Sequence, residues 1–335
     1  MDFRAAWWLP GAHPQTLWGR LARSRRLAPL RRELLETPDG DELVVDHLDS
    51  EQADAPRLVL LHGLEGSSYS VYVQGLLAHI RRRGWPATAI NFRSCARDPL
   101  NPSAMLPNRR PRLYHSGDTA DLDFVVRALA CREPSRRLFA IGVSLGGNAL
   151  LKWLGENGES ARQLLTAAVT ISVPYDLGAG SRHLETALGR FYVGWFLKTL
   201  RPKAIAVARR FPEAAARVDV QGVARSRTFR EFDEASTAPL HGFRDADDYY
   251  DRCSSIRFAG RIAVPTLCLS ARDDPFLPCE VLDRFRAAAS PRVELVVARH
   301  GGHAGFVSGG LPWRARFWAE ETAVSWLEQF AAELV

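Results

Sequence analysis

The chain alternates short, continuously apolar runs with segments of helical periodicity. Apolar runs that predict buried strands lie at 57–63, 87–93, 136–144, 167–174, 264–271 and 292–299. Apolar residues that recur every three or four positions predict helices over 67–84, 116–130 (capped by Ser116 or Asp118), 145–158, about 279–289 and after Pro312. Strands that are apolar throughout and are separated by helices form parallel sheets covered on both faces. The pattern therefore predicts an α/β fold, with a mostly parallel central sheet flanked by helices.

Two segments near the start of the chain differ from this alternation. Residues 31–50 carry two apolar runs around the turn sequence "PDGD", which predicts an antiparallel hairpin at one edge of the sheet. Residues 1–30 are broken by proline and glycine, and we expect them to form a strap packed on the domain.

A third segment, residues 175–260, interrupts the alternation between two predicted strands. It has no strong strand pattern, and its helical pattern is clearest over 184–200 and 203–218. We therefore expect a helical cap inserted over the carboxyl edge of the sheet, and a single domain over 1–335. The proline-rich loop 94–115 is long for a plain connection, so we expect it to border a functional site.

Composition and charge exclude several classes of protein. The net charge of +6 comes mainly from arginine, in clusters that lack an aromatic stacking platform or a recognition-helix pattern, so no nucleic-acid partner is expected. Five scattered cysteines without a C-x-x-C pair argue against a disulfide framework and a zinc site. Neither a signal peptide nor an apolar run of ~18 residues is evident, which favours a cytoplasmic protein without a transmembrane segment. The aromatic, basic N-terminus is compatible with weak contact with a membrane surface.

The segment Gly142-Val143-Ser144-Leu145-Gly146 lies between a predicted strand and a predicted helix. Its glycine spacing does not match the phosphate-binding patterns. It matches G-x-S-x-G, in which a tight strand-to-helix turn projects a nucleophilic serine above the sheet. Glycine is needed two residues before and after the serine because side chains there would collide. Ser144 is therefore the candidate nucleophile.

A serine hydroxyl becomes an effective nucleophile only when a base accepts its proton and an acid orients that base. After a later strand, "LSARDDPFLP" (269–278) offers Asp274, with Asp273 as the alternative acid. After the last strand, "RHGGHAGF" (299–306) offers His303 as the base, because the preceding glycines let it swing over the sheet edge. His300, directly at the strand end, is more consistent with a structural role.

Acyl transfer also requires N–H donors for the developing oxyanion. The residue after the nucleophile, Leu145, supplies one main-chain N–H. The loop "HGLEGSS" (62–68), which follows the strand at 57–61, suggests Leu64 as the second donor. The alternative for this loop is a tight turn with no chemical role.

These motifs together resemble the YheT-like α/β-hydrolases, a group with esterase or phospholipase activity. The resemblance covers nearly the whole chain, through the segments "WWLPGAHPQTLWGRL" (7–21), "LLHGLEGSSYSVYVQGL" (60–76), "NFRSCA" (91–96), "YHSGDTADL" (114–122), "GVSLGGNALLKWLGE" (142–156), "DDYYDRCSS" (247–255), "ARDDPFLP" (271–278) and "GGHAGF" (301–306). It implies an α/β-hydrolase fold, a Ser144–His303–Asp274 catalytic triad and hydrolysis of carboxylic esters. In the family pattern the second acid of the aspartate pair is the more invariable one, which favours Asp274 over Asp273.

The resulting hypothesis is a serine carboxylesterase that needs no metal or organic cofactor and acts on a small-molecule ester or a lipid. An acyltransferase or a phospholipase with the same triad, and a non-catalytic scaffold, are the alternatives. Within the matching segments, Arg93 either anchors a substrate carboxylate or pairs with a carboxylate of the protein, and His115 and Asp118 are expected to order their loop. The acyl-chain length depends on how residues 175–260 cover the pocket.

Overall fold

A computed structural model describes residues 2–23, 27–101 and 104–332. Within them an eight-stranded sheet has the order β1-β2-β4-β3-β5-β6-β7-β8. Its strands are β1 (Arg31–Glu36), β2 (Glu42–Leu48), β3 (Arg57–Leu61), β4 (Ala87–Ile90), β5 (Leu138–Val143), β6 (Ala167–Ile171), β7 (Thr266–Ala271) and β8 (Val293–Ala298). Strands β1 and β2 pair in antiparallel fashion at one edge, and β3 to β8 are parallel. The predicted α/β architecture and the edge hairpin are confirmed.

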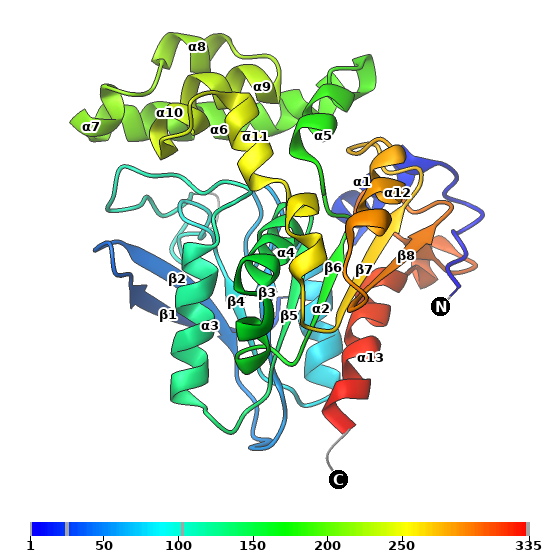
Figure 1. Ribbon diagram of the computed structural model, residues 1–335. Helices are drawn as coiled ribbons and strands as arrows, with labels where there is room; N and C mark the ends of the chain where they lie inside the picture. The colour runs from blue at the N-terminus through cyan, green and yellow to red at the C-terminus, as the bar shows by residue number, and fades with distance from the viewer. Residues whose placement is uncertain (1, 24–26, 102–103, 333–335) are drawn as a thin grey trace.

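Helices cover both faces of the sheet (Figure 1). One face packs against α3 (Ala120–Arg132), α4 (Leu145–Asn157) and α12 (Glu280–Ala288), and the other against α2 (Val71–Arg82) and α13 (Trp318–Ala332). Every residue of β3, β5, β6 and β7 is buried. Burial on both faces explains why these strands are apolar runs without alternation.

The start of α3 differs from the prediction. The helix begins at Ala120 behind Thr119, and no side chain caps it. Asp118, predicted as a cap, instead accepts two hydrogen bonds from the Arg112 guanidinium, at 2.7 and 2.8 Å. The main-chain N–H of Ser116, the other predicted cap, donates to the hydroxyl of Tyr249. The ion pair and this tertiary hydrogen bond replace the local cap that the sequence suggested.

The insertion between β6 and β7 is helical and lies over the carboxyl edge of the sheet (Figure 1). It comprises α5 (Leu177–His183), α6 (Ala187–Arg210), α7 (Pro212–Ala215), α8 (Val220–Arg225), α9 (Phe229–Phe232), a π-helical turn (Asp233–Thr237), α10 (Ala238–His241), α11 (Ala246–Cys253) and two short 3₁₀ turns ending at Arg261. Its apolar side chains form a core of their own. The cap predicted from sequence therefore corresponds to a compact helical layer.

The helical pattern at 184–200 and 203–218 is confirmed, but the two stretches are not divided where the pattern breaks. One helix, α6, continues through Pro202, and the short α7 follows it. Proline inside a helix removes a hydrogen bond and normally interrupts the helix. Here Leu197 and Leu200 before the proline and Ala204 after it pack into the same cap core, while Pro202 itself is exposed. Tertiary packing on both sides of the proline therefore keeps the helix continuous.

The N-terminal segment contains a helix, α1 (Ala12–Ala22), that the sequence interpretation as a strap did not anticipate. The segment packs near the short strand pair β9 (Val307–Ser308) and β10 (Arg316–Phe317). Gln15 is fully buried, and its side chain hydrogen-bonds to Leu9 and to both main-chain groups of Val307. Across the described ranges, no helix is both long enough and apolar enough to cross a membrane.

Candidate active site

Ser144 occupies a strained turn between β5 and α4. Its φ of 54° and ψ of −119° lie outside the regions that non-glycine residues normally adopt. A Cβ at Gly142 would lie 2.6 Å from the carbonyl oxygen of Gly146, and a Cβ at Gly146 would lie 2.5 Å from that of His62. Both distances are too short for real atoms, so the turn requires glycine at these two positions. The serine hydroxyl is thereby held at the carboxyl end of a central strand.

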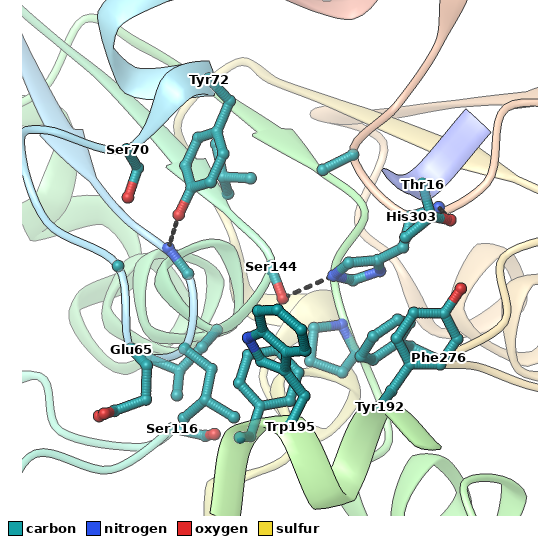
Figure 2. Close-up of a pocket in the computed structure, with 18 of the residues that line it drawn as sticks. Thr16, Glu65, Ser70, Tyr72, Ser116, Ser144, Tyr192, Trp195, Phe276 and His303 are labelled. Atoms are coloured by element: carbon teal, nitrogen blue, oxygen red, sulfur yellow. Dashed lines mark hydrogen bonds between the residues drawn. The ribbon is translucent and has the colours of Figure 1, made fainter. Parts of the chain in front are cut away.

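His303 and Asp274 form a hydrogen-bonded line with Ser144. The Nε2 atom of His303 lies 2.9 Å from Ser144 Oγ (Figure 2). Its Nδ1 atom lies 2.9 and 3.1 Å from the two carboxylate oxygens of Asp274. The side chains of His303 and Asp274 are 12% and 8% exposed. This geometry lets the imidazole accept a proton from the hydroxyl while the carboxylate orients the ring.

Asp273 and His300, the alternatives from sequence, lie beside this line rather than in it. One carboxylate oxygen of Asp273 accepts the main-chain N–H of Gly302 at 3.0 Å. The other lies 3.4 Å from Nδ1 of His300, whose side chain is 53% exposed. The structure therefore brings Asp274 and His303 to Ser144, and Asp273 to the backbone of the loop that carries His303.

The loop that carries His303 is held from three sides. The main-chain N–H of His303 donates to Thr16 Oγ1 at 2.9 Å, and that of Ala304 donates to Ser172 Oγ at 2.8 Å. The ring of Phe276 stacks on the imidazole, with ring centroids 4.2 Å apart and an angle of 26° between the planes. These contacts restrict the imidazole to the orientation in which it reaches both partners.

Leu64 and Leu145, the two predicted oxyanion donors, lie beside the serine. Strand β3 pairs with β5 so that Leu61 lies opposite Gly142, which brings the loop after β3 next to the turn after β5. On either side of Leu64 the main-chain N–H groups are occupied: Gly63 donates to the hydroxyl of Tyr72 at 2.7 Å, and Glu65 to that of Tyr114 at 2.6 Å. The N–H groups of Leu64 and Leu145 have no acceptor among the described residues. They are therefore free to donate to a ligand.

A cavity of about 760 Å³ opens above Ser144 and His303. Tyr192, Trp195 and Phe276 reach it from the cap and from the loop after β7 (Figure 2), and helix α1 contributes Thr16 and Leu17. Tyr114, from the proline-rich loop, also lines it. The volume lies within the range of small-molecule sites, which are mostly apolar with a few polar groups at the reacting end.

His62 is buried directly before the loop that carries Leu64, and its contacts are structural. Its Nδ1 atom lies 2.7 Å from the carbonyl oxygen of Gly63, and its Nε2 atom accepts the N–H of Phe92 at 3.1 Å. Burial lowers the pKa of His62 to about 4, so the ring is neutral near pH 7. A neutral ring with both nitrogens engaged is suited to fixing the turn rather than to moving protons.

Arg93 pairs with carboxylates of the protein. This is the second of the two alternatives that the sequence left open, the first being a contact with a substrate carboxylate. Its guanidinium contacts Asp39 and Asp41 in the turn of the hairpin and Asp121 in α3, at 2.7 to 3.2 Å. The Arg93 side chain is almost completely buried. This cluster joins the turn of the hairpin to helix α3.

Several residues that support the site were not singled out from sequence, among them Thr16, Tyr72 and Tyr114. All three lie in segments that carry the family resemblance. Each one provides a hydroxyl that accepts a main-chain N–H from a loop of the site. Their position in those segments was the available signal, but hydroxyl-to-backbone contacts between distant segments have no local sequence pattern.

Comparison with known proteins gives a consistent family. Residues 56–310 match the α/β hydrolase fold family. The Escherichia coli protein YheT, to which an esterase activity is provisionally assigned, is 36% identical over 95% of this chain and 90% of its own length. Phospholipase ABHD3 of Bos taurus is 32% identical over 91% of this chain and 73% of its own length. An esterase from Pyrococcus furiosus superposes with a TM-score of 0.57 over 90% of this chain and 91% of that structure, at 16% identity, which speaks for the fold alone. On the family match and the identity to YheT, the chain belongs to the α/β hydrolase fold family.

Proposed function

We propose that this protein is a serine hydrolase that cleaves carboxylic esters through an acyl-enzyme intermediate. The observation that carries the proposal is the hydrogen-bonded line from Ser144 Oγ through His303 to Asp274, at the strained turn after β5. The family relationship to esterases and phospholipases supports the same reaction class.

In the first half of the reaction, His303 Nε2 accepts the proton of Ser144 as Oγ attacks the ester carbonyl. The resulting oxyanion receives hydrogen bonds from the N–H groups of Leu64 and Leu145. Asp274 stabilises the imidazolium through Nδ1. The imidazolium then protonates the departing alcohol, the carbon–oxygen bond of the ester breaks, and the acyl group stays on Ser144.

In the second half, water enters the site vacated by the alcohol. His303 takes a proton from the water as its oxygen attacks the acyl-enzyme. The tetrahedral intermediate collapses, the proton returns to Ser144 Oγ, and the carboxylic acid leaves. No step requires a metal or an organic cofactor.

The cavity favours an ester with an apolar acyl chain. Aromatic and aliphatic side chains of α6, including Phe191, Trp195 and Leu200, line it above Ser144. Burial of an acyl chain against such side chains contributes about 0.8 kcal/mol for each methylene removed from water. We therefore include lipid esters in the substrate class. In this proposal the cap insertion and the rest of the chain act as one domain around the site.

Hydrolysis of p-nitrophenyl esters of increasing acyl length tests the proposal. Wild type should turn these esters over, and Ser144→Ala and His303→Ala should reduce kcat by about 10³-fold or more, as removal of a triad member does in serine hydrolases. Adding an alcohol acceptor and analysing the products separates hydrolysis from acyl transfer. Turnover that survives both substitutions would contradict the proposal.

A further inference from the structure

Lys203 of the cap helix α6 reaches down to the loop after β3. Its Nζ atom lies 2.5 Å from Oε1 of Glu65, and the side chains are 11% and 7% exposed. The ammonium group also lies 5.5 Å from the centre of the Tyr114 ring. Since the pair is almost completely removed from water, neither charge can be satisfied by solvent when the other is absent.

Glu65 directly follows Leu64, the proposed oxyanion donor, and its backbone is held in an unfavourable conformation. Its φ is 55°, in the left-handed region that non-glycine residues rarely adopt. Its N–H donates to the Tyr114 hydroxyl at 2.6 Å, and that hydroxyl donates back to Oε1 at 2.9 Å. In Figure 2 the side chain of Glu65 extends away from Ser144. The carboxylate thus anchors the loop on the side away from Ser144. The main-chain N–H of Glu65 is unavailable to substrate, because it already donates to Tyr114.

We propose that Lys203 is a positioning residue that links the seating of the cap to the oxyanion site. By pairing with Glu65, it holds the loop so that the Leu64 N–H faces the developing oxyanion. It also neutralises a carboxylate that would otherwise lie buried one residue away from that negative charge. The inference rests on the proposed function and extends it, because a cap that lifts from the sheet would withdraw Lys203 and disable the donor.

Two physical arguments support this role. A buried carboxylate without its cation is costly, so the loop would relax until Glu65 reached water or acquired a proton. A donor that moves by a fraction of an ångström from the oxyanion loses much of its effect on the rate, because the contribution depends on preorganised geometry. Removal of Lys203 should therefore reduce the rate of the chemical step more than it weakens substrate binding.

Steady-state kinetics on four variants tests the proposal with the p-nitrophenyl ester that wild type hydrolyses best. Lys203→Met should lower kcat by about tenfold or more while KM stays within about twofold. Lys203→Arg should retain most of the activity, since it preserves the charge. The double variant Glu65→Gln/Lys203→Met should be more active than Lys203→Met, because it no longer contains the unpaired carboxylate.

Arg209→Met is the matched control. Arg209 lies six residues later on the same helix, and its side chain is exposed and forms no hydrogen bond or ion pair with any described residue. Its substitution should leave kcat and KM unchanged. Circular dichroism checks that each variant is folded like wild type. If Lys203→Met does not fold, Tyr114→Phe takes its place, because it removes the hydroxyl that holds the same loop and should likewise lower kcat.

Each outcome decides between the roles. An active wild type in which Lys203→Met matches Arg209→Met would overturn the role of Lys203 and leave the proposed function intact. A loss confined to KM, or a double variant no better than Lys203→Met, would also overturn it in favour of a merely structural tie. A folded wild type with no ester turnover would overturn the proposed function, and this inference with it.

Discussion

The main-chain N–H of His303 donates a 2.9 Å hydrogen bond to Oγ1 of Thr16, which joins helix α1 to the loop that carries the candidate base. The contact between helix and loop is close. A Cβ at Gly302 would lie 2.4 Å from the carbonyl oxygen of Ala12, and a Cβ at Gly305 would lie 2.2 Å from that of Gln15. The N-terminal segment is therefore a direct support of the candidate active site, although it lies almost 300 positions away in the sequence.

We expect Thr16→Val to lower kcat by about fivefold, because it removes one hydrogen bond, worth about 1 kcal/mol, from the loop of the base without changing the shape of the side chain. Thr199→Val is the matched control. The Thr16 hydroxyl donates to the carbonyl of Ala12 in its own helix, and the Thr199 hydroxyl donates in the same way to the carbonyl of Phe196. Thr199 is exposed on α6 and does not contact the loop of His303. Equal kcat values for the two variants would show that the contact does not position His303.

Substitution of the aspartate pair should separate the two candidate acids. Asp274→Asn should lower kcat by about 10³- to 10⁴-fold, since it removes the charge that orients and stabilises the imidazolium. Asp273→Asn should stay within about tenfold of wild type, because an amide oxygen can still accept the Gly302 N–H that Asp273 accepts here. The measurement is kcat on folded protein, and the reverse order of the two losses would assign the acid to Asp273.

Arg93→Met should destabilise the fold and leave the affinity for substrate unaltered. The substitution removes the Arg93 cation from three carboxylates, of which Asp41 and Asp121 are buried. Breaking a buried ion pair in this way costs about 3–5 kcal/mol. Urea unfolding gives the change in free energy, and KM is measured below the transition. A raised KM with unchanged stability would instead favour a contact between Arg93 and a substrate carboxylate.

Asp233 makes the stability of the cap depend on pH. Its carboxylate accepts hydrogen bonds from the hydroxyls of Thr237, at 2.6 Å, and Tyr250, at 2.7 Å. Burial outweighs these hydrogen bonds and raises the pKa of Asp233 from 3.8 to about 6. Because the folded-state pKa lies above the unfolded one, the folded state binds more protons between these two values. The contribution of Asp233 to stability therefore falls as the pH rises through this window.

Asp233→Asn should consequently gain stability relative to wild type as the pH rises from about 4 to about 7, by about 2 kcal/mol. Urea unfolding of both proteins at several pH values gives this difference, and the comparison cancels the titration of all other groups. A difference that stays constant with pH, or that shrinks as the pH rises, would contradict the account of Asp233.

The fold could be predicted from sequence where one local rule sufficed. Strands buried on both faces are continuous apolar runs, and their alternation with helices specifies a parallel sheet. Ser144 could be located as a candidate because its turn admits only glycine at positions 142 and 146. The order of nucleophile, acid and base along the chain then restricted the partners to two short loops.

The remaining features depend on contacts between distant segments. The continuity of α6 through Pro202 comes from side chains that share one core, and the missing cap of α3 from the ion pair between Asp118 and Arg112. Likewise, the hydroxyls of Thr16 and Tyr114 reach loops far away in the sequence. Such contacts leave no periodicity to detect, so only the folded arrangement reveals them.

The most direct test of the central claim is the reaction of the protein with an active-serine fluorophosphonate probe, followed by mass spectrometry of the labelled peptide. Wild type should carry one phosphonyl group on Ser144, because His303 and the two free N–H groups activate that hydroxyl. Ser144→Ala should not be labelled, and His303→Ala should react far more slowly. Equal labelling of wild type and Ser144→Ala, or a label mapped to another residue, would contradict the assignment of Ser144 as the nucleophile.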